Sequence, residues 1–334
     1  MTDRIRLAGK VAVVTGAGRG LGRAYAEALA AAGAAIVVND VDADAADAAV
    51  DHITTSGGDA VAVAAPVGAA EVADRLVEAA VDRFGRLDVM VTNAGVLRDG
   101  VLWKMTDEAF DEVIRTHLRG TFTCARAAAV RFREQGDGGR ILVVGSPAGQ
   151  HGNFGQTNYA AAKAGIVAFA RTWSMELRKA GVTVNAIVPT AWTAMTASIP
   201  IYAPLVELVE QGQPLPQEVR QAHALGMPED CAPLVVWLAS EASADVTGQA
   251  IGIGGDMLTL YSHPAEARVE LHEGGWTPEA VAAAWEERLA GLAQPSGIVL
   301  PALVGIGGDT CGPDLSPDEA TFHDELRVAR GRCA

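Results

Sequence analysis

The stretch TGAGRGLG at residues 15–22 determines how the rest of the chain is interpreted. It follows an apolar run, KVAVVT at 10–15, and precedes a helical pattern at 20–32, so we expect it to join a buried strand to a helix. Glycines at such a junction permit a tight turn and let backbone N–H groups approach a pyrophosphate, which the helix N-terminus attracts. The sequence therefore predicts a dinucleotide-binding loop. Its predicted cofactor contacts are Gly16, Arg19, Gly20, Leu21 and Gly22.

Outward from this loop, short apolar runs alternate with longer amphipathic stretches as far as residue 256. The expected strands lie at 10–15, 35–39, 60–65, 87–92, 140–145, 182–188 and 250–253. The expected helices lie at 20–32, 43–56, 69–84, 106–134, 157–180 and 228–240. Apolar strands that alternate with helices predict a parallel sheet covered on both faces. The expected fold class is α/β, with a doubly wound, seven-stranded, Rossmann-type sheet and a C-terminal extension.

Asp40 ends the second expected strand, where it bears on the choice of dinucleotide. A carboxylate at this position accepts both ribose hydroxyls of NAD and repels the 2′-phosphate of NADP. Arg19 argues the other way, because a cation in the loop attracts a 2′-phosphate. We give Asp40 more weight, since its repulsion of the phosphate is direct, and expect NAD as the cofactor. The alternative is an aspartate that only forms a turn.

Three polar side chains form the candidate catalytic group: Ser146, Tyr159 and Lys163. Tyr159 and Lys163 lie four positions apart and share one helix face, while Ser146 follows the fifth expected strand, at the sheet edge where ligands bind. A phenol is a poor base at neutral pH, but a nearby ammonium and an oxidised nicotinamide both stabilise its phenolate and lower its pKa. Tyr159 is therefore expected to take the proton of an alcohol as hydride leaves, with Ser146 holding the substrate oxygen. Lys163 is also a candidate for the nicotinamide ribose.

Together these motifs resemble the short-chain dehydrogenase/reductase family, over roughly residues 5–256. The resemblance rests on the loop at 15–22, Asn93-Ala94-Gly95, Ser146, Tyr159 with Lys163, and NAIVP at 185–189. It implies a sheet ordered 3-2-1-4-5-6-7 and a homotetramer or homodimer. It also implies that Asn93, Ala94 and Gly95 line the cofactor, although the same residues would serve a simple turn after a strand.

A narrower resemblance is to the (3R)-hydroxyacyl-CoA dehydrogenase part of peroxisomal multifunctional enzymes. It is carried by NAGVLRDG at 93–100, HLRG at 117–120, GNFGQTNY at 152–159 and PEDCAPLVVWL at 228–238. Most of the wider family has Asn where this chain has His117, a position tied to a proton relay through the lysine. His117 is therefore either a catalytic residue supporting a water near Lys163 or a residue that satisfies a helix contact.

Two further departures concern the cofactor. Pro66 stands where the family has an Asp that touches adenine, which leaves the backbone of Val67 as the expected contact. After Pro189 the chain has Thr190 in place of Gly, and Thr193 lies one place early. Thr190 is accordingly the candidate for the nicotinamide end.

An apolar segment at about 191–227 is long for a connection, and insertions of this kind often form lids. Trp192 and Phe154 are the predicted substrate contacts beside Ser146 and Tyr159, the alternative being ordinary packing of the lid on the body. Three interpretations fit several arginines on the 106–134 helix: they bind CoA phosphates, they pair with acidic residues at a subunit interface, or they face solvent. The leading function is oxidation of a 3-hydroxyacyl-CoA, including one that bears a steroid. The alternatives are a hydroxysteroid dehydrogenase, a 3-oxoacyl carrier-protein reductase, and a non-catalytic nucleotide-binding scaffold.

Composition limits the other possibilities. The 334 residues are 49% hydrophobic and 20% charged, as in globular proteins, and the formal charge of −15 disfavours nucleic acid and anionic membranes. The four cysteines form no C-x-x-C pair, so we expect reduced thiols, a cytoplasmic protein and no metal site. No segment at the start has the apolar run of a signal peptide. We expect a catalytic domain at 1–256 and an extension at 257–334, with one helix at 277–291.

Overall fold

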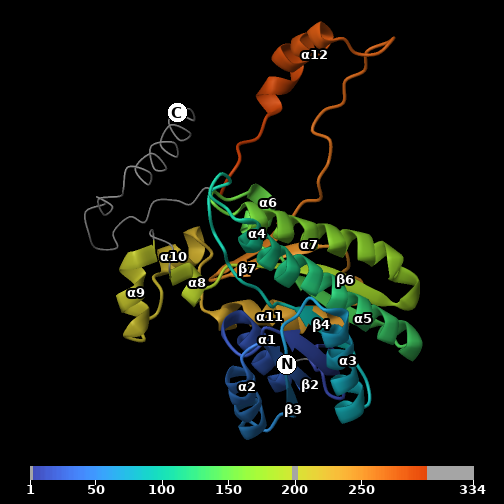
Figure 1. The fold of residues 1–334 in the computed structure, drawn as a ribbon, viewed down its shortest axis with the longest axis vertical. Helices are drawn as coiled ribbons and strands as arrows, with labels where there is room; N and C mark the ends of the chain where they lie inside the picture. The colour runs from blue at the N-terminus through green and yellow to red at the C-terminus, as the bar shows by residue number, and fades with distance from the viewer. Residues whose placement is uncertain (1–2, 198–201, 299–334) are drawn as a thin grey trace.

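The computed structural model describes residues 3–197 and 202–298, which include one eight-stranded sheet (Figure 1). Its strands are β1 (Val11–Thr15), β2 (Ala35–Asp40), β3 (Ala60–Ala64), β4 (Val89–Thr92), β5 (Gly139–Val144), β6 (Val182–Pro189), β7 (Ala250–Gly254) and β8 (Met257–Tyr261). They lie in the order β3-β2-β1-β4-β5-β6-β7-β8, and β1 to β7 run parallel. The predicted fold class and the implied order of its seven strands are confirmed.

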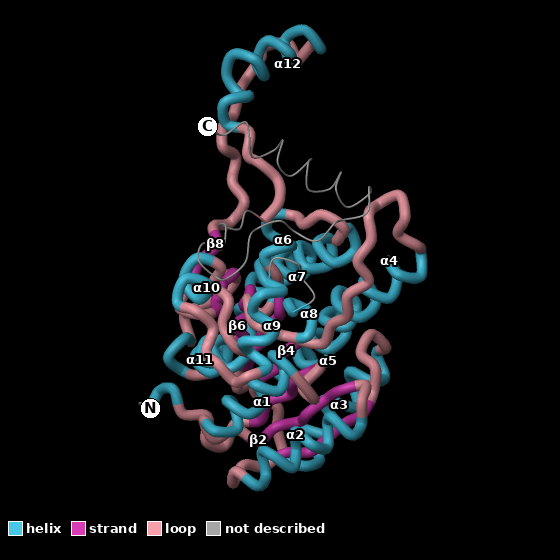
Figure 2. Tube along the Cα trace, turned by 90° about the vertical axis from the view of Figure 1, so that its left-hand side faces the viewer, coloured by secondary structure: helices cyan, strands magenta, loops and turns pink. Residues whose placement is uncertain are grey.

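Helices cover both faces of this sheet (Figure 2). One face carries α1 (Gly20–Ala31), α2 (Ala43–Thr55) and α11 (Pro228–Ala239), and the other α3 (Ala70–Phe84), α5 (Gly120–Gln135) and α7 (Thr157–Glu176). Alternate residues of one strand serve the two cores: Ala12 and Val14 pack with the first set of helices, and Val11 and Val13 with the second. Because both faces are buried, the strands are apolar throughout rather than alternating.

The sheet has one strand more than expected. β8 pairs antiparallel with β7 through the two-residue loop Gly255-Asp256, and the positive φ of Gly255 suits such a hairpin. Its side chains Leu258 and Leu260 are exposed. Its opposite face is only partly buried, with Tyr261 packed against the core, so the hydrophobic pattern did not reveal the strand.

The helix predicted over 106–134 is also interrupted. α4 (Asp107–Val113) passes into a π turn, η2 (Ile114–Arg119), before α5 begins. Because a single π turn leaves the α-helical spacing of apolar residues unchanged on both sides, the sequence pattern did not reveal it. π turns inside helices occur frequently at functional sites, and this one carries His117.

In its described residues, 191–197 and 202–227, the predicted lid contains three short helices, α8 (Ala194–Ala197), α9 (Ala203–Glu210) and α10 (Gln217–Ala222). Residues on and around them form an apolar cluster of their own: Trp192, Tyr202, Leu205, Leu215, Val219 and Leu225. The lid is thus a small packed unit rather than an open loop.

Beyond β8 the chain leaves the body as an arm, residues 262–296, that carries α12 (Pro278–Ala284) at its far end (Figure 1). The predicted helix at 277–291 is present as α12 and the turns that follow it. The arm returns to the body at Gly297, whose N–H donates to the His151 carbonyl at 2.8 Å. The division of the chain at residue 256 stays a prediction. In the described parts, no helix is both long and apolar enough to span a membrane.

Candidate active site

The predicted site residues converge on the carboxyl ends of the central strands. The Gly-rich loop follows β1, Asp40 ends β2, residues 93–95 follow β4, and Ser146 follows β5. Parallel sheets bind ligands at this edge, near the point where the strand order reverses. In this sheet the reversal lies between β1 and β4, which are neighbours.

The Gly-rich loop is packed so tightly at Gly16 and Gly22 that neither position has room for a side chain. A Cβ on Gly16 would lie 2.7 Å from the Ala94 Cα, and one on Gly22 would lie 2.1 Å from the Gly16 carbonyl oxygen. Asn93 fixes this arrangement, since its amide donates to the carbonyls of Thr15 at 3.0 Å and Gly16 at 3.1 Å. The loop runs into the N-terminus of α1, where no side chain caps the helix. Exposed N–H groups and a side-chain-free cradle suit the pyrophosphate of a dinucleotide.

Asn93 itself therefore braces the loop, and Ala94 is the loop's immediate neighbour. Gly20 has a positive φ, and a Cβ there would lie 4.0 Å from the Thr193 side chain. Leu21 packs against the core beneath the loop. Asn93 thus acts through its amide, whereas Ala94, Gly20 and Leu21 contribute through their backbone or packing.

The ribose end of the site is acidic. The Asp40 carboxylate is buried and accepts hydrogen bonds from the N–H groups of Gly18 at 2.9 Å and Asp42 at 3.1 Å. The cation of the loop, Arg19, forms an ion pair with Asp42. Two carboxylates, those of Asp40 and Asp42, thus lie at the carboxyl end of β2. The Arg19 guanidinium, which would otherwise attract a 2′-phosphate, is already paired with Asp42.

Two other predicted cofactor residues have mainly structural contacts. Val67 follows β3 and packs against the position of Gly120, where a Cβ would lie 2.9 Å from its methyl group. Thr190 continues from β6, and its N–H donates to the Ile253 carbonyl at 2.9 Å. Thr193 bonds to Thr196 within the first turn of the lid. Their roles toward a cofactor stay predictions.

Ser146, Tyr159 and Lys163 do come together. Ser146 caps the short helix α6 (Pro147–His151), and its Oγ accepts the N–H of Ala148 at 3.2 Å. Lys163 is buried and donates to the Val144 carbonyl at 2.7 Å, with its Nζ 5.5 Å from the centre of the Tyr159 ring. The two elements meet closely because Gly149 lacks a side chain, since a Cβ there would lie 2.6 Å from the Lys163 carbonyl carbon.

Burial dominates the acid–base character of this group. It lowers the pKa of Lys163 to about 7 and raises the pKa of Tyr159, with a hydrogen bond between Tyr159 and Ser146 opposing that rise and the charge of Asp99 adding to it. The expected lowering of the phenol pKa is thus not a property of these residues alone. A buried ammonium with a depressed pKa is only partly charged near neutrality, so a second positive charge beside Tyr159 is needed to favour the phenolate.

His117 contacts the same cluster from the π turn. It is buried, and its ring meets Tyr159 edge to face with centroids 5.1 Å apart. Burial and the nearby Lys163 lower the pKa of His117 to about 3. The imidazole is consequently neutral at physiological pH and serves only as a neutral donor or acceptor.

The two aromatic residues predicted to touch substrate are separated. Trp192 is buried in the lid cluster against Tyr202, with ring centroids 6.5 Å apart, which favours the packing alternative for this residue. Phe154 is 48% exposed, on a segment whose Gly155 carbonyl accepts the N–H of Gly100 at 2.8 Å. That contact brings the loop at 96–105 beside Phe154.

Sequence reasoning missed Asn158, which is fully buried next to Tyr159. Its amide donates to the carbonyls of Arg98 at 3.0 Å and Ala109 at 3.1 Å, and so ties the start of α7 to the neighbouring loop and to α4. A buried amide in an otherwise apolar helix needs partners, and that mismatch was the available signal.

Comparison with known proteins finds relatives over most of the chain. The sequence pattern of the short chain dehydrogenase family matches residues 10–200. The chain is 42% identical over 304 residues to the hydroxyacyl-CoA dehydrogenase ChsB1 of Mycobacterium tuberculosis, covering 87% of this chain and 92% of that enzyme. It is 39% identical over 297 residues to peroxisomal multifunctional enzyme type 2 of Mus musculus, covering 86% of this chain but 37% of that longer enzyme. A crystal structure of a short chain dehydrogenase from Mycobacterium avium superposes with a TM-score of 0.75 at 38% identity, covering 89% of this chain and 99% of that one.

Proposed function

The chain belongs to the short-chain dehydrogenase family, and we propose that it is an NAD-dependent enzyme interconverting a 3-hydroxyacyl-CoA and its 3-oxo form. The observation that carries the proposal is the buried group of Ser146, Tyr159 and Lys163 beside a Gly-rich loop with no room for side chains. A non-catalytic scaffold has no use for a phenol held against a desolvated ammonium.

NAD, when bound, supplies the acceptor for the hydride that leaves the carbinol carbon. Tyr159 takes the proton of the substrate hydroxyl and returns it in the reverse reaction. The Ser146 Oγ accepts from the Ala148 N–H, and its hydroxyl, which shares a hydrogen bond with Tyr159, would hold the substrate oxygen in line beside the phenol. The Lys163 ammonium would stabilise the phenolate and would bind a hydroxyl of the nicotinamide ribose. The Gly16–Gly22 segment and Asn93 to Gly95 form the cradle.

The preference for NAD rests on the acidic tip of β2. Asp40 and Asp42 would both repel a 2′-phosphate, and Arg19 would have to give up Asp42 to bind one. This also disfavours the alternative of an NADPH-dependent 3-oxoacyl carrier-protein reductase.

A large substrate is supported by exposed apolar side chains on the two segments that meet at Gly100 and Gly155. Trp103 and Leu102, on the loop held against Gly155, are 76% and 71% exposed, and Phe154, which precedes Gly155, is 48% exposed. Such a surface suits an acyl chain or a steroid, so a hydroxysteroid dehydrogenase is the second candidate. Two arginines of the long helix add no support for CoA, because Arg119 donates to the Gly68 carbonyl and Arg126 lies over Phe122.

We further propose a cytoplasmic homo-oligomer, a dimer or tetramer, in which the arm contributes to a subunit interface. Its side chains Leu271, Trp276 and Trp285 are 91%, 42% and 52% exposed, which is unusual for groups of this size in a monomer. Deletion of residues 263–334 should reduce the assembly measured by light scattering. An unchanged number of subunits, together with unchanged activity, would show that the arm is not part of the interface.

The test of the proposed reaction is NADH formation with 3-hydroxyacyl-CoAs of several lengths and with hydroxysteroids, run in parallel with NADP. We expect turnover of the CoA esters with NAD. Asp40→Ser should raise the relative kcat/KM for NADP by about tenfold or more, the cost of a close like charge. Asp44→Ser, on the first turn of α2, is the matched control. Turnover of steroids alone would select the second candidate.

A further inference from the structure

One arginine fastens the end of the lid to the body of the protein. Residues 217–227, here called the lid base, comprise α10 and the segment that leads into α11. The Arg220 guanidinium, on α10, donates to the two carboxylate oxygens of Asp230 at 2.9 and 3.2 Å and to the Asp256 carboxylate at 2.8 Å. Asp230 lies in the first turn of α11 and Asp256 in the loop between β7 and β8. A single side chain thus joins three elements, and its two carboxylate partners fix its orientation.

The backbone of the lid base also fits closely against the loop between β7 and β8. The Asp256 N–H donates to the Arg220 carbonyl at 3.2 Å. A Cβ on Gly255 would lie 2.4 Å from that same carbonyl oxygen, and one on Gly226 would lie 2.5 Å from the Gly255 nitrogen. Because side chains are excluded at both crossings, the docked position is set by close backbone contact as well as by the ion pairs.

The docked lid base carries backbone strain at Ala224. Its φ of 52° is the one positive value at a non-glycine residue within the ranges 3–197 and 202–298. The left-handed region is unfavourable for a residue with a Cβ. The Ala224 carbonyl nonetheless packs on β7, where a Cβ on Gly254 would lie 2.2 Å from its oxygen. Strain of this kind persists only where surrounding contacts impose it, and here the ion pairs of Arg220 and the close backbone contacts do so.

The lid base in turn holds the start of the lid. The Gly226 carbonyl accepts the Trp192 N–H at 2.6 Å, and Ala191 pairs with Gly226 in a parallel bridge. Thr193 comes next, and a Cβ on Gly20 of the Gly-rich loop would lie 4.0 Å from its side chain. The segment at 191–193 therefore lies between the lid base and the loop predicted to bind the dinucleotide.

We propose that Arg220 is a positioning residue that holds the lid base docked, so that residues 191–193 form one wall of the dinucleotide site. The ion pairs of Arg220 favour the docked state, and the strain at Ala224 favours release. Only the docked state presents the complete wall, so the apparent affinity for the dinucleotide scales with the docked fraction. This inference deepens the proposed function and rests on it for the identity of the dinucleotide.

The first test needs neither substrate nor cofactor. Hydrogen exchange of the Trp192 and Asp256 amides reports release of the lid base, because both amides bond across the docking contact. Arg220→Gln should speed their exchange by about tenfold, the effect of losing charge-assisted hydrogen bonds. Ala224→Gly should slow their exchange by about fivefold, because glycine adopts the same φ without strain.

The matched control is Arg288→Gln. It removes a guanidinium that is bound to the carboxylates of Glu270 and Glu287 in the arm, and it should leave the exchange of both amides unchanged. Exchange that is unchanged in Arg220→Gln, or not slowed in Ala224→Gly, overturns the proposal.

The second test is the affinity for NAD and NADP, measured by calorimetry. Arg220→Glu places a third carboxylate beside Asp230 and Asp256, so the docked state should become the minor one and the Kd should rise by about tenfold. Ala224→Gly in that background should recover about threefold of the affinity. A merely damaged fold would instead lower the number of binding sites and leave the Kd of the remaining sites unchanged.

An unchanged Kd in Arg220→Glu, with or without a loss of sites, overturns the proposal. If no acyl-CoA is oxidised, the proposed function fails, while the exchange rates and the dinucleotide affinity still decide the role of Arg220.

Discussion

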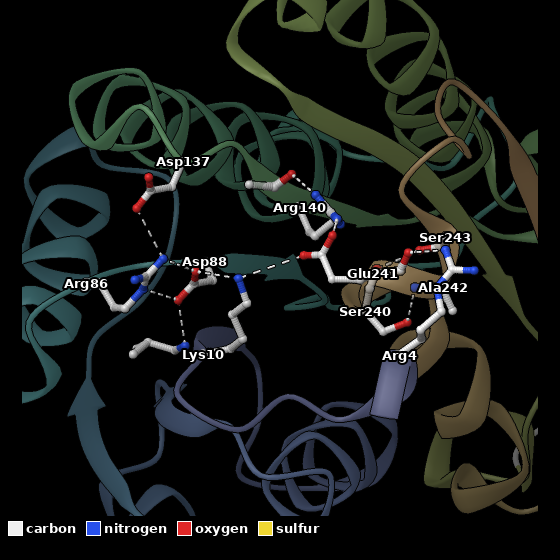
Figure 3. Close-up of polar contacts among 12 residues, drawn as sticks. Arg4, Lys10, Arg86, Asp88, Asp137, Arg140, Ser240, Glu241, Ala242 and Ser243 are labelled. Carbon is white, nitrogen blue, oxygen red and sulfur yellow. Dashed lines mark hydrogen bonds and ion pairs between the residues drawn. The ribbon is translucent and has the colours of Figure 1, made fainter. Parts of the chain in front are cut away.

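The two ends of the central strands differ in how their buried charged groups are paired. At their amino ends, Asp88 is buried and fully paired: it accepts the Val11 N–H at 2.9 Å, binds the Arg86 guanidinium through both oxygens at 2.9 and 2.7 Å, and lies 3.4 Å from the Lys10 Nζ (Figure 3). At their carboxyl ends, Lys163 is equally buried, yet within the described residues it has a carbonyl and no carboxylate for a partner.

The difference separates stability from chemistry. A buried charge with several partners has its desolvation cost offset, whereas one without a counter-ion shifts its pKa instead. The ion pairs around Asp88 form an amino-terminal network, named for the amino ends of the strands, that joins residues from distant parts of the chain. Glu241, which follows α11, pairs with both Lys10 and Arg140 (Figure 3). The network links the amino ends of β1, β4 and β5, while near the carboxyl ends of the same strands burial lowers the pKa of Lys163 to about 7.

The largest effect is expected from Tyr159→Phe. Removing the proton-transferring hydroxyl should lower kcat by about 10³-fold, while the free energy of unfolding changes by less than about 1 kcal/mol because one buried hydroxyl is lost with its hydrogen bond. NADH formation and urea unfolding measure the two quantities. Activity within tenfold of the unaltered enzyme would show that another group transfers the proton.

At the opposite edge, Asp88→Ala should reverse this pattern. It leaves the buried Val11 N–H without its acceptor and strips two cations of their partner, so the free energy of unfolding should fall by about 3 kcal/mol. At a temperature where the variant is folded, kcat and KM should be unchanged. A loss of activity without a loss of stability would mean that the two edges are not separable.

Much of this comparison was open to prediction from the sequence. The seven parallel strands and the candidate catalytic group were found because apolar runs, a Gly-rich turn and a phenol four positions from a lysine are local patterns. Asp88 was not singled out, since Lys10 and Val11, unlike its neighbour Arg86, reach it only after β1 and β4 pair in the sheet.

The rest eluded prediction for other physical reasons. β8 has two exposed leucines and only one partly buried face, and the π turn at 114–119 leaves α-helical spacing on either side of it. Trp192 carries the same apolar signal whether it lines a cleft or packs inside the lid, so its burial against Tyr202 could come only from the fold. The contact of His117 with Val96 depends on the same π turn.

Lys163→Met should make the two edges alike by removing the unpaired charge. The pKa of Lys163 is lowered to about 7 in the folded protein, against 10.5 for an ordinary lysine. Between pH 7 and 10.5 this amine binds a proton in the unfolded chain but not in the folded one, so the free energy of unfolding rises with pH. Below about pH 7 both states are protonated, and the gain in stability is absent. The unaltered protein should therefore gain about 2–3 kcal/mol over the variant between pH 7 and 9. Parallel pH profiles would mean that Lys163 is not buried as a partly neutral amine.

The smallest effect is expected from Glu241→Gln, which tests whether exposure or pairing decides the strength of the amino-terminal network. Glu241 contacts Lys10 at 3.9 Å and Arg140 at 3.4 Å, but its side chain is 61% exposed, against 9% for Asp88. Solvent screens such pairs, so urea unfolding should show a change within about 0.5 kcal/mol, shrinking further in salt. A loss comparable to that of Asp88→Ala would instead show that the network acts as one cooperative unit, with Glu241 supporting Asp88 through Lys10.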